Sequence, residues 1–249
     1  MSSPLEIRGL RTGDVWLASK LTKGFGGDEW DVMHGEYFDK SFHDVLDGKS
    51  IARITSENKQ RTGKSFALDL MGYGDILRRN VHLDGGVAVA LSDQRLPKDK
   101  RSDEEDNIDF VEGNILHNST WAALQRWLDR QEVEDKHFDL IICRPISGFN
   151  NLGYNSGVYI TLIQKAWRLL SPHNGALLTQ IPDRPRVKPI FGEKVIADWV
   201  KLLNATQGVR ANYSYRATLT EEGMVSYPAL GLTKSEGAPA KLPLLPTEK

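Results

Sequence analysis

The stretch SFALDLMGYGDILRR, residues 65–79, decides the fold of this chain. It begins with a short apolar run, FALDLM, which is typical of a strand buried on both faces of a sheet. Gly72 and Gly74 then permit a tight turn, and DILRR can continue as a brief helix. A strand, a tight turn and a helix in this order predict the first unit of an α/β domain with a parallel sheet.

The same pattern recurs along the chain. Four further apolar runs predict strands at 86–93, 108–114, 138–143 and 175–182, and amphipathic spacing predicts helices from 118, over 158–170 and over 193–206. The charged stretch 98–107 is interpreted as a solvated loop. Two β runs, 212–219 and 224–233, are joined too closely for a crossover helix and predict a terminal antiparallel hairpin. Pro228 predicts a bulge or broken pairing in it, because proline lacks the ladder N–H. We therefore expect a doubly wound, mainly parallel, seven-stranded sheet.

The two ends of the chain differ in composition from this central part. Residues 1 to about 27 predict an irregular leader, and a helix of aromatic and aliphatic spacing is predicted over 28–47, with Asp28 as its N-cap. We assign 1–64 to a leader and helical extension that is a possible lid, and 65–233 to the α/β domain. The proline-containing segment 234–249 is expected to be a flexible tail.

Composition limits the classes of function. The chain has 249 residues, and its 32 Lys and Arg nearly balance 33 Asp and Glu, so no overall basic field favours nucleic acid or an anionic membrane. Cys143 is the single cysteine, which excludes disulfides within the chain and favours a reducing, cytoplasmic compartment. No signal pattern or membrane-spanning run is present, and the six histidines lack metal-ligand spacing, so no metal is expected. The oligomeric state is not indicated.

Five local signatures occur in order, and together they resemble the Rossmann-like S-adenosylmethionine-dependent methyltransferases. They are ALDLMGYGD (67–75), ALSDQR (90–95), VEGNIL (111–116), DLIICRPISG (139–148) and LLSPHNGALLTQIP (169–182). The resemblance covers about 65–233. It implies that S-adenosylmethionine lies across the carboxyl ends of the strands.

The resemblance also implies a set of cofactor-binding residues. Asp69 would hold the methionyl amino group, Gly72 and Gly74 would leave room for the nucleoside, Asp93 would accept from both ribose hydroxyls, and Asn114 would meet the adenine amine. Neighbouring residues of the same segments complete the set: Tyr73, Ile115 and Cys143.

Two alternatives to a methyltransferase stay open at this stage. The turn DLMGYGD departs from the family's D-x-G-x-G-x-G, which also fits an inactive methyltransferase-like scaffold or binding protein. In that case Asp69 is a cap of its own turn and Asp93 an ordinary acid at a strand end. A nicotinamide-dependent dehydrogenase would need a G-x-G-x-x-G turn, which is lacking here.

The segment CRPISG after the fourth predicted strand bears on the reaction. It lacks the N/D-P-P-aromatic motif of base amino methylation, and Ile146 stands where a nucleophilic cysteine would be needed for attack on a pyrimidine. Arg144 is our candidate for orienting an anionic acceptor, and Cys143 is expected to be a buried hydrophobe. Methyl transfer to an O or N nucleophile is expected, with a small metabolite slightly favoured over RNA. The basic run 183–188, together with Arg53, Lys59, Arg61 and Lys64, is the feature that would favour RNA.

Overall fold

The computed structural model describes residues 39, 41–78, 80, 82–93, 95–133, 135–143, 156–181, 192–214, 218–219, 225–226 and 228–246. The statements below concern these residues. The predicted leader, most of the predicted helix over 28–47 and the basic run 183–188 lie outside them. Within the helix prediction, Phe42 is buried and a short 3-10 helix, η2 (His43–Val45), is present.

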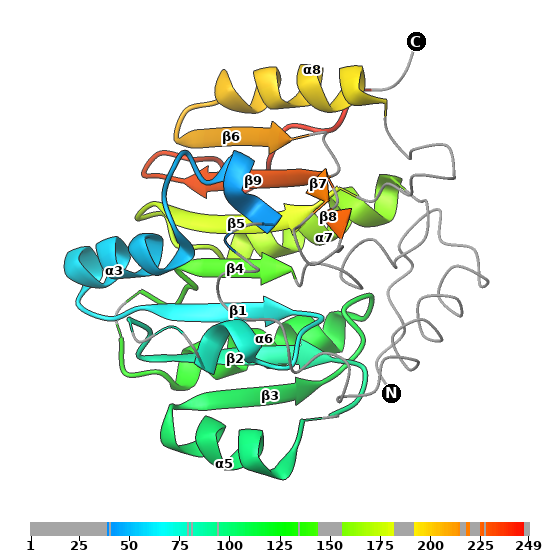
Figure 1. Ribbon diagram of the computed structural model, residues 1–249. Coiled ribbons are helices and arrows are strands. Elements are labelled where there is room, and N and C mark those ends of the chain that lie inside the picture. Colours follow the sequence, from blue (N-terminus) through cyan, green and yellow to red (C-terminus); the bar gives the residue numbers. More distant parts are fainter. Residues whose placement is uncertain are drawn as a thin grey trace.

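A seven-stranded sheet forms the centre of the molecule (Figure 1). Its order is β3 (Ile108–Glu112), β2 (Gly85–Ala90), β1 (Phe66–Leu70), β4 (Leu140–Cys143), β5 (Gly175–Gln180), β9 (Ala229–Lys234) and β6 (Val209–Ser214). The first five strands pair in parallel, whereas β9 pairs antiparallel with both β5 and β6. The predicted doubly wound sheet with a terminal antiparallel pair is confirmed.

The hairpin between β6 and β9 contains a smaller hairpin, formed by β7 (Thr218–Leu219) and β8 (Val225–Ser226). Pro228 follows β8 and precedes β9, and its carbonyl accepts a hydrogen bond from the Ile181 N–H at 2.6 Å. The β run predicted over 224–233 is thus interrupted at Pro228, which lies between β8 and β9, although its carbonyl still bonds to the chain just after β5.

Helices cover both faces of the sheet. One face carries α6 (Asn118–Arg130), α7 (Ser156–Leu169) and α8 (Glu193–Asn204), and the other carries η2, α3 (Ile51–Thr62) and α4 (Asp75–Arg78) (Figure 1). Alternate residues of β1 serve the two faces: Leu68 and Leu70 join the core under α6 and α7, and Ala67 joins the core under α3 and α4. No described helix has the length and apolar character needed to span a bilayer.

Helix α3 was missed by the sequence analysis, which considered Arg53, Lys59, Arg61 and Lys64 only as basic residues that would favour RNA. Its start and stop signals are present, since Ser50 accepts from the Arg53 N–H and Gly63 ends the helix at φ +79°. The buried face includes Thr55 and Asn58, which bond to Asn80 and to the Asp139 carbonyl. Because polar side chains form part of its buried face, α3 lacks the apolar periodicity by which a helix is predicted from sequence.

The predicted solvated loop at 98–107 is also corrected. Most of it forms α5 (Pro97–Glu105), which begins at a proline and is capped by the Asp99 carboxylate accepting from the Leu96 N–H at 3.3 Å. Asp103 is the one buried residue of this helix, so its packing depends on an ionic contact rather than on an apolar stripe.

The predicted flexible tail is corrected up to Pro246. Residues 236–246, here called the strap, pack on α7 and α8. The indole N–H groups of Trp167 and Trp199 donate to the carbonyls of Pro239 and Pro243, each at 2.9 Å. The Gln164 amide forms two hydrogen bonds with the backbone of Leu242, whose side chain is buried. Prolines end regular elements, but their carbonyls remain acceptors, and that is how this segment is held.

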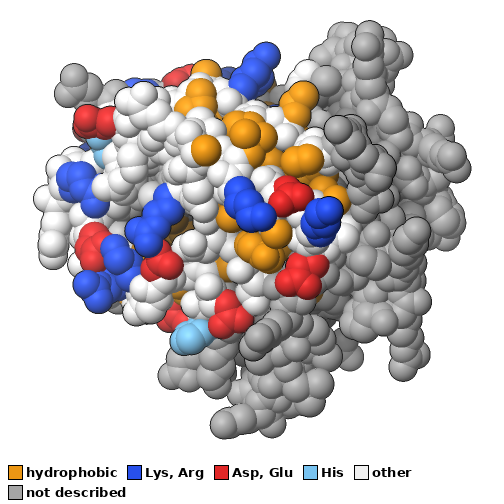
Figure 2. Space-filling model, turned by 90° about the horizontal axis from the view of Figure 1, so that it is seen from above, with side chains coloured by type: hydrophobic (Ala, Val, Ile, Leu, Met, Phe, Trp, Pro, Cys, Tyr) orange, Lys and Arg blue, Asp and Glu red, His pale blue; other side chains and the backbone are white. Residues whose placement is uncertain are grey.

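Figure 2 shows the side of the molecule that carries α8. Hydrophobic side chains gather in the middle of the described part of this face, among Lys, Arg, Asp and Glu side chains. Two large hydrophobic side chains of the described residues are exposed: Leu202 of α8 and Leu244 of the strap.

Candidate functional site

The carboxyl ends of four parallel strands meet at one edge of the sheet. Leu70 at the end of β1 pairs with Val89 of β2 on one side and with Cys143 of β4 on the other, and Val89 pairs with Val111 of β3. From β1 the chain adds β2 and β3 on one side, and it then returns to add β4 and β5 on the other side. Ligands bind in open α/β sheets at such a reversal of strand order, here between β1 and β4. Most of the residues predicted for the site follow these strand ends.

Asp69 is turned into the loop that follows it. The side chain is fully buried, and its carboxylate accepts the Gly74 N–H at 3.0 Å. A Cβ on Gly72 would lie 2.0 Å from a carboxylate oxygen of Asp69, so only glycine fits there. Gly74 has φ +88°, a conformation that strains other residues. Contacts and backbone conformation within the chain itself thus explain why both positions of the predicted motif are glycine.

Tyr73 links this turn to the neighbouring strand. Its ring stacks on Phe110 of β3, with centroids 6.4 Å apart and planes 8° apart. Its carbonyl accepts two hydrogen bonds from the guanidinium of Arg78, each at 3.0 Å. The turn is therefore held from two sides, by an aromatic contact and by a charged donor.

Asp93 follows β2 and is held by two cations. Oδ1 accepts from the backbone N–H of Arg95 at 3.1 Å and from its Nε at 3.0 Å, and Oδ2 accepts from Arg95 Nη2 and Lys100 Nζ, both at 3.0 Å. Hydrogen bonds from Arg95 are the main reason that the pKa of Asp93 is well below its usual range. The carboxylate is thus ionised at neutral pH and fully engaged by this chain.

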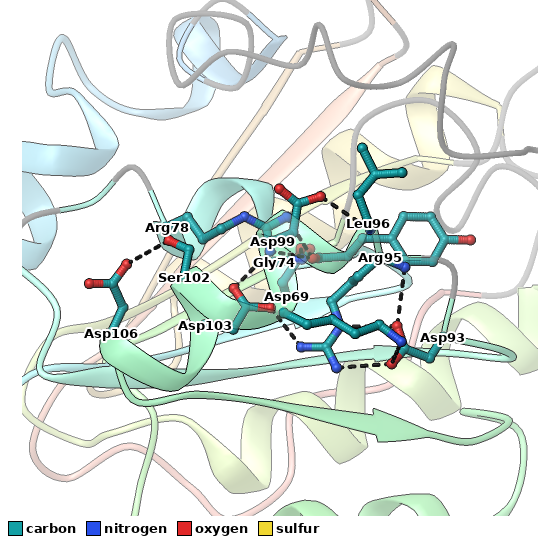
Figure 3. A network of polar contacts seen from close by, with 12 residues as sticks. Asp69, Gly74, Arg78, Asp93, Arg95, Leu96, Asp99, Ser102, Asp103 and Asp106 are labelled. Carbon is teal, nitrogen blue, oxygen red and sulfur yellow. Dashed lines mark hydrogen bonds and ion pairs between the residues drawn. The ribbon is translucent and has the colours of Figure 1, made fainter.

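A buried ionic network lies behind Asp93 (Figure 3). Arg95 also donates to Asp103 of α5 at 2.6 Å, and Asp103 accepts from Arg78 at 2.8 Å. Arg78 further pairs with Asp75 at 3.2 Å, and the Arg95 guanidinium lies 4.6 Å from the centroid of the Phe110 ring. Sequence analysis missed Arg78, Arg95 and Asp103. The opposite charges in SDQR and KDKRSDEED could have indicated these ion pairs, but the stretch 98–107 was interpreted as a solvated loop.

Asn114 and Ile115 form the turn after β3. The Asn114 side-chain oxygen accepts the Leu116 N–H at 2.9 Å, and its carbonyl accepts from Thr120 Oγ1 at 2.7 Å. Ile115 is buried, and its carbonyl accepts the Trp121 indole N–H at 2.6 Å. The turn is firmly anchored to α6, with the Asn114 side chain half-buried at the strand ends.

The remaining predicted residues are placed as follows. Cys143 ends β4 and is fully buried in the core, as expected of a structural cysteine. Arg144 and Ile146 lie outside the described residues. Within the part of the chain that is described, no three His, Cys, Asp or Glu side chains are arranged to hold a metal ion.

No protein-family model matches this chain, and no curated protein matches it. Solved structures do. The plantazolicin methyltransferase BamL, solved with a desmethylplantazolicin analogue and S-adenosylhomocysteine, is 11% identical with a TM-score of 0.50, over 90% of this chain and 96% of that chain. WbdD, solved with a kinase inhibitor, is 14% identical with a TM-score of 0.50, over 87% of this chain and 47% of that chain. An O-methyltransferase from Bacillus cereus in complex with S-adenosylhomocysteine is 14% identical with a TM-score of 0.45, over 92% of this chain and 94% of that chain. At such low identity the likeness shows the fold: this chain has the Rossmann-like class I methyltransferase fold.

Proposed function

We propose that this chain is an S-adenosylmethionine-dependent methyltransferase that methylates an O or N nucleophile. The observation that carries the proposal is the set of oxygen acceptors at the carboxyl ends of adjacent strands: Asp69 in β1, Asp93 after β2 and Asn114 after β3. All three lie on the β1 side of the reversal of strand order between β1 and β4, in a fold shared with BamL, whose structure contains S-adenosylhomocysteine.

The described residues fit this cofactor in part. Gly72 and Gly74 do not bear on the fit, because a Cβ on Gly72 would meet the Asp69 carboxylate and Gly74 is required by its own backbone conformation. Ile115 and Cys143 give the strand ends an apolar floor. One contact must change, because the Asp93 carboxylate, which would receive the ribose hydroxyls, is engaged by Arg95 and Lys100.

When bound, S-adenosylmethionine supplies a methyl group on a sulfonium, so the transfer needs no nucleophile from the protein. The chain has to align the acceptor with the methyl carbon and exclude water, and alignment alone can lower the barrier by several kcal/mol. A buried Cys143 is suited to excluding water rather than to nucleophilic attack. Arg144 remains our proposal for holding an anionic acceptor by two-point hydrogen bonding.

A non-catalytic scaffold is the second candidate, and one observation favours it. Both glycines of the turn are explained by contacts inside the chain, and Asp93 is engaged by the chain's own cations. A protein that has lost its cofactor could retain these features for stability. Direct binding measurements separate the two candidates.

The test is calorimetric titration of the full chain with S-adenosylmethionine, S-adenosylhomocysteine and NAD. We expect the first two to bind and NAD not to bind. Asn114→Ala should weaken S-adenosylhomocysteine binding by about tenfold, because it removes a hydrogen-bonding side chain, and Asn118→Ala, an exposed residue of α6, should not. Binding of NAD alone would overturn the assignment, and no binding at all would favour the scaffold.

The acceptor class is also a proposal, and we favour a small metabolite. The four described basic side chains that would favour RNA all have partners in the chain. Arg53 pairs with Glu57, Lys59 pairs with Asp84, Lys64 Nζ donates to the Glu132 carbonyl, and Arg61 donates to the His173 carbonyl. An RNA acceptor would show a steep loss of affinity as salt increases. Binding of a mixed RNA pool that persists at low salt and disappears at moderate salt would favour RNA instead. We further propose a cytoplasmic location, since Cys143 is the only cysteine.

A further inference from the structure

The Asp93 carboxylate has no acceptor capacity left. An ionised carboxylate offers about four lone-pair sites. Arg95 takes three of them, through its backbone N–H, Nε and Nη2, and Lys100 Nζ takes the fourth. Every one of these donors lies within 3.1 Å of a carboxylate oxygen. Two ribose hydroxyls cannot bond to Asp93 while these contacts persist.

Arg95 is held in this position by more than Asp93. Its side chain is 11% exposed, its Nη1 donates to the buried Asp103, and its guanidinium lies over the Phe110 ring. Figure 3 shows the Arg95 side chain between Asp103 and Asp93. The two contacts are made by different nitrogens, so the guanidinium can leave Asp93 and keep its bond to Asp103. Lys100 is about half-exposed and can turn to water.

We propose that Arg95 is a built-in competitor of the nucleoside, which sets the chain's affinity for its cofactor by holding the carboxylate that the ribose needs. Binding exchanges the Nε and Nη2 donors of Arg95 for two hydroxyl donors, while Asp103 retains the guanidinium. The inference rests on the proposed function, because it assumes that the ribose binds at Asp93. It deepens that function by naming the residue that opposes binding.

The magnitude follows from the type of contact. A hydrogen bond to a charged group contributes about 1.5–3 kcal/mol, and 1.4 kcal/mol corresponds to a factor of ten in affinity. Removal of the Arg95 side-chain donors should therefore tighten nucleoside binding by at least about tenfold. Removal of the half-exposed Lys100 should tighten it by only about two- to fivefold, as for a surface ion pair.

The experiment is calorimetric titration of the full chain with S-adenosylhomocysteine. Arg95→Met keeps a flexible side chain over Phe110 without donors, Lys100→Met removes the second cation, and Arg101→Met, an exposed position in the same helix as Lys100, controls for lost charge. We expect the dissociation constant to fall about tenfold or more in Arg95→Met and about two- to fivefold in Lys100→Met. In Arg101→Met it should not change. The gain from Arg95→Met should vanish when Asp93→Asn is added, because the effect acts through that carboxylate.

Each result bears on the inference. Among the described residues, Arg95→Met leaves Asp103 paired with Arg78 alone, so thermal unfolding must show that the variant folds. Should it not fold, Lys100→Met and its Asp93→Asn combination decide. Equal or weaker binding by the variants than by the wild type would overturn the inference and leave the proposed function intact. Absence of binding by every folded variant, wild type included, would overturn both.

Discussion

Asp139 gives the sharpest prediction about stability. It precedes β4, is 4% exposed, and accepts the Phe66 N–H at 3.0 Å. Burial, with a smaller contribution from the negative charge of Asp135, raises its pKa from the ordinary 3.8 to about 6. Asp139 is therefore a buried acid, directly before β4, whose charged form is poorly solvated.

The sign of the effect follows from proton binding. Between about pH 4 and pH 6 the folded chain holds a proton on Asp139 that the unfolded chain has released. The free energy of unfolding therefore falls as the pH rises through this window, and it levels off above it. A difference of about two pKa units corresponds to a loss of about 3 kcal/mol at neutral pH.

The perturbation is Asp139→Asn, which keeps an oxygen for the Phe66 N–H and cannot ionise. We expect the variant to equal the wild type near pH 4 and to exceed its free energy of unfolding by up to about 3 kcal/mol at pH 8. Urea denaturation across this range measures the difference. The control is Asp129→Asn, at an exposed position of α6. Its free energy of unfolding should differ from that of the wild type by the same amount across this pH range. A pH-independent difference for Asp139→Asn, or a wild type more stable at pH 8, would refute the reasoning.

Three further predictions concern other parts of the chain. Gly72→Ala should lower the free energy of unfolding by about 1–3 kcal/mol in urea titration, because its Cβ would overlap the Asp69 carboxylate; an unchanged transition would contradict this. Leu242→Ala should cost about 2–5 kcal/mol, since its side chain is buried where Gln164 holds the strap; a loss below 1 kcal/mol would show that the strap adds little to stability. Cys143→Ala should keep most of the proposed methyl-transfer activity, and complete inactivation of a folded variant would mean that the thiol takes part.

The strands and the long helices could be predicted from sequence because their burial is apolar. The runs at 66–70 and 85–90 are buried at every position, and α6 and α8 present apolar stripes. Burial of this kind appears in the sequence as a run or a period. The antiparallel position of β9 could be predicted because two β runs follow one another too closely for a crossover.

The elements that could not be predicted are held by polar contacts. Helix α3 packs through Thr55 and Asn58, α5 through Asp103, and the strap through indole bonds to proline carbonyls. The contacts of α3 and of the strap join residues far apart in the chain, whereas Asp103 of α5 bonds to Arg95, only eight residues away, and none of these contacts leaves a periodic pattern. In the candidate site, Asp93 could be named from its place after a strand. Its engagement by the nearby Arg95 and Lys100 was missed, although the opposite charges in SDQR and KDKRSDEED were a signal for it.

The glycine turn is therefore a weaker guide to function than its motif suggests. Gly72 is required by the Asp69 carboxylate, and Gly74 by its own backbone conformation, so both would be retained by an enzyme and by an inactive scaffold alike. Asp93 differs, because under our proposal its protein partners and a ribose compete for the same oxygens. An enzyme must release this carboxylate when the nucleoside arrives, whereas a scaffold needs only the ion pairs. The choice between the two functions thus depends on whether Asp93 exchanges partners.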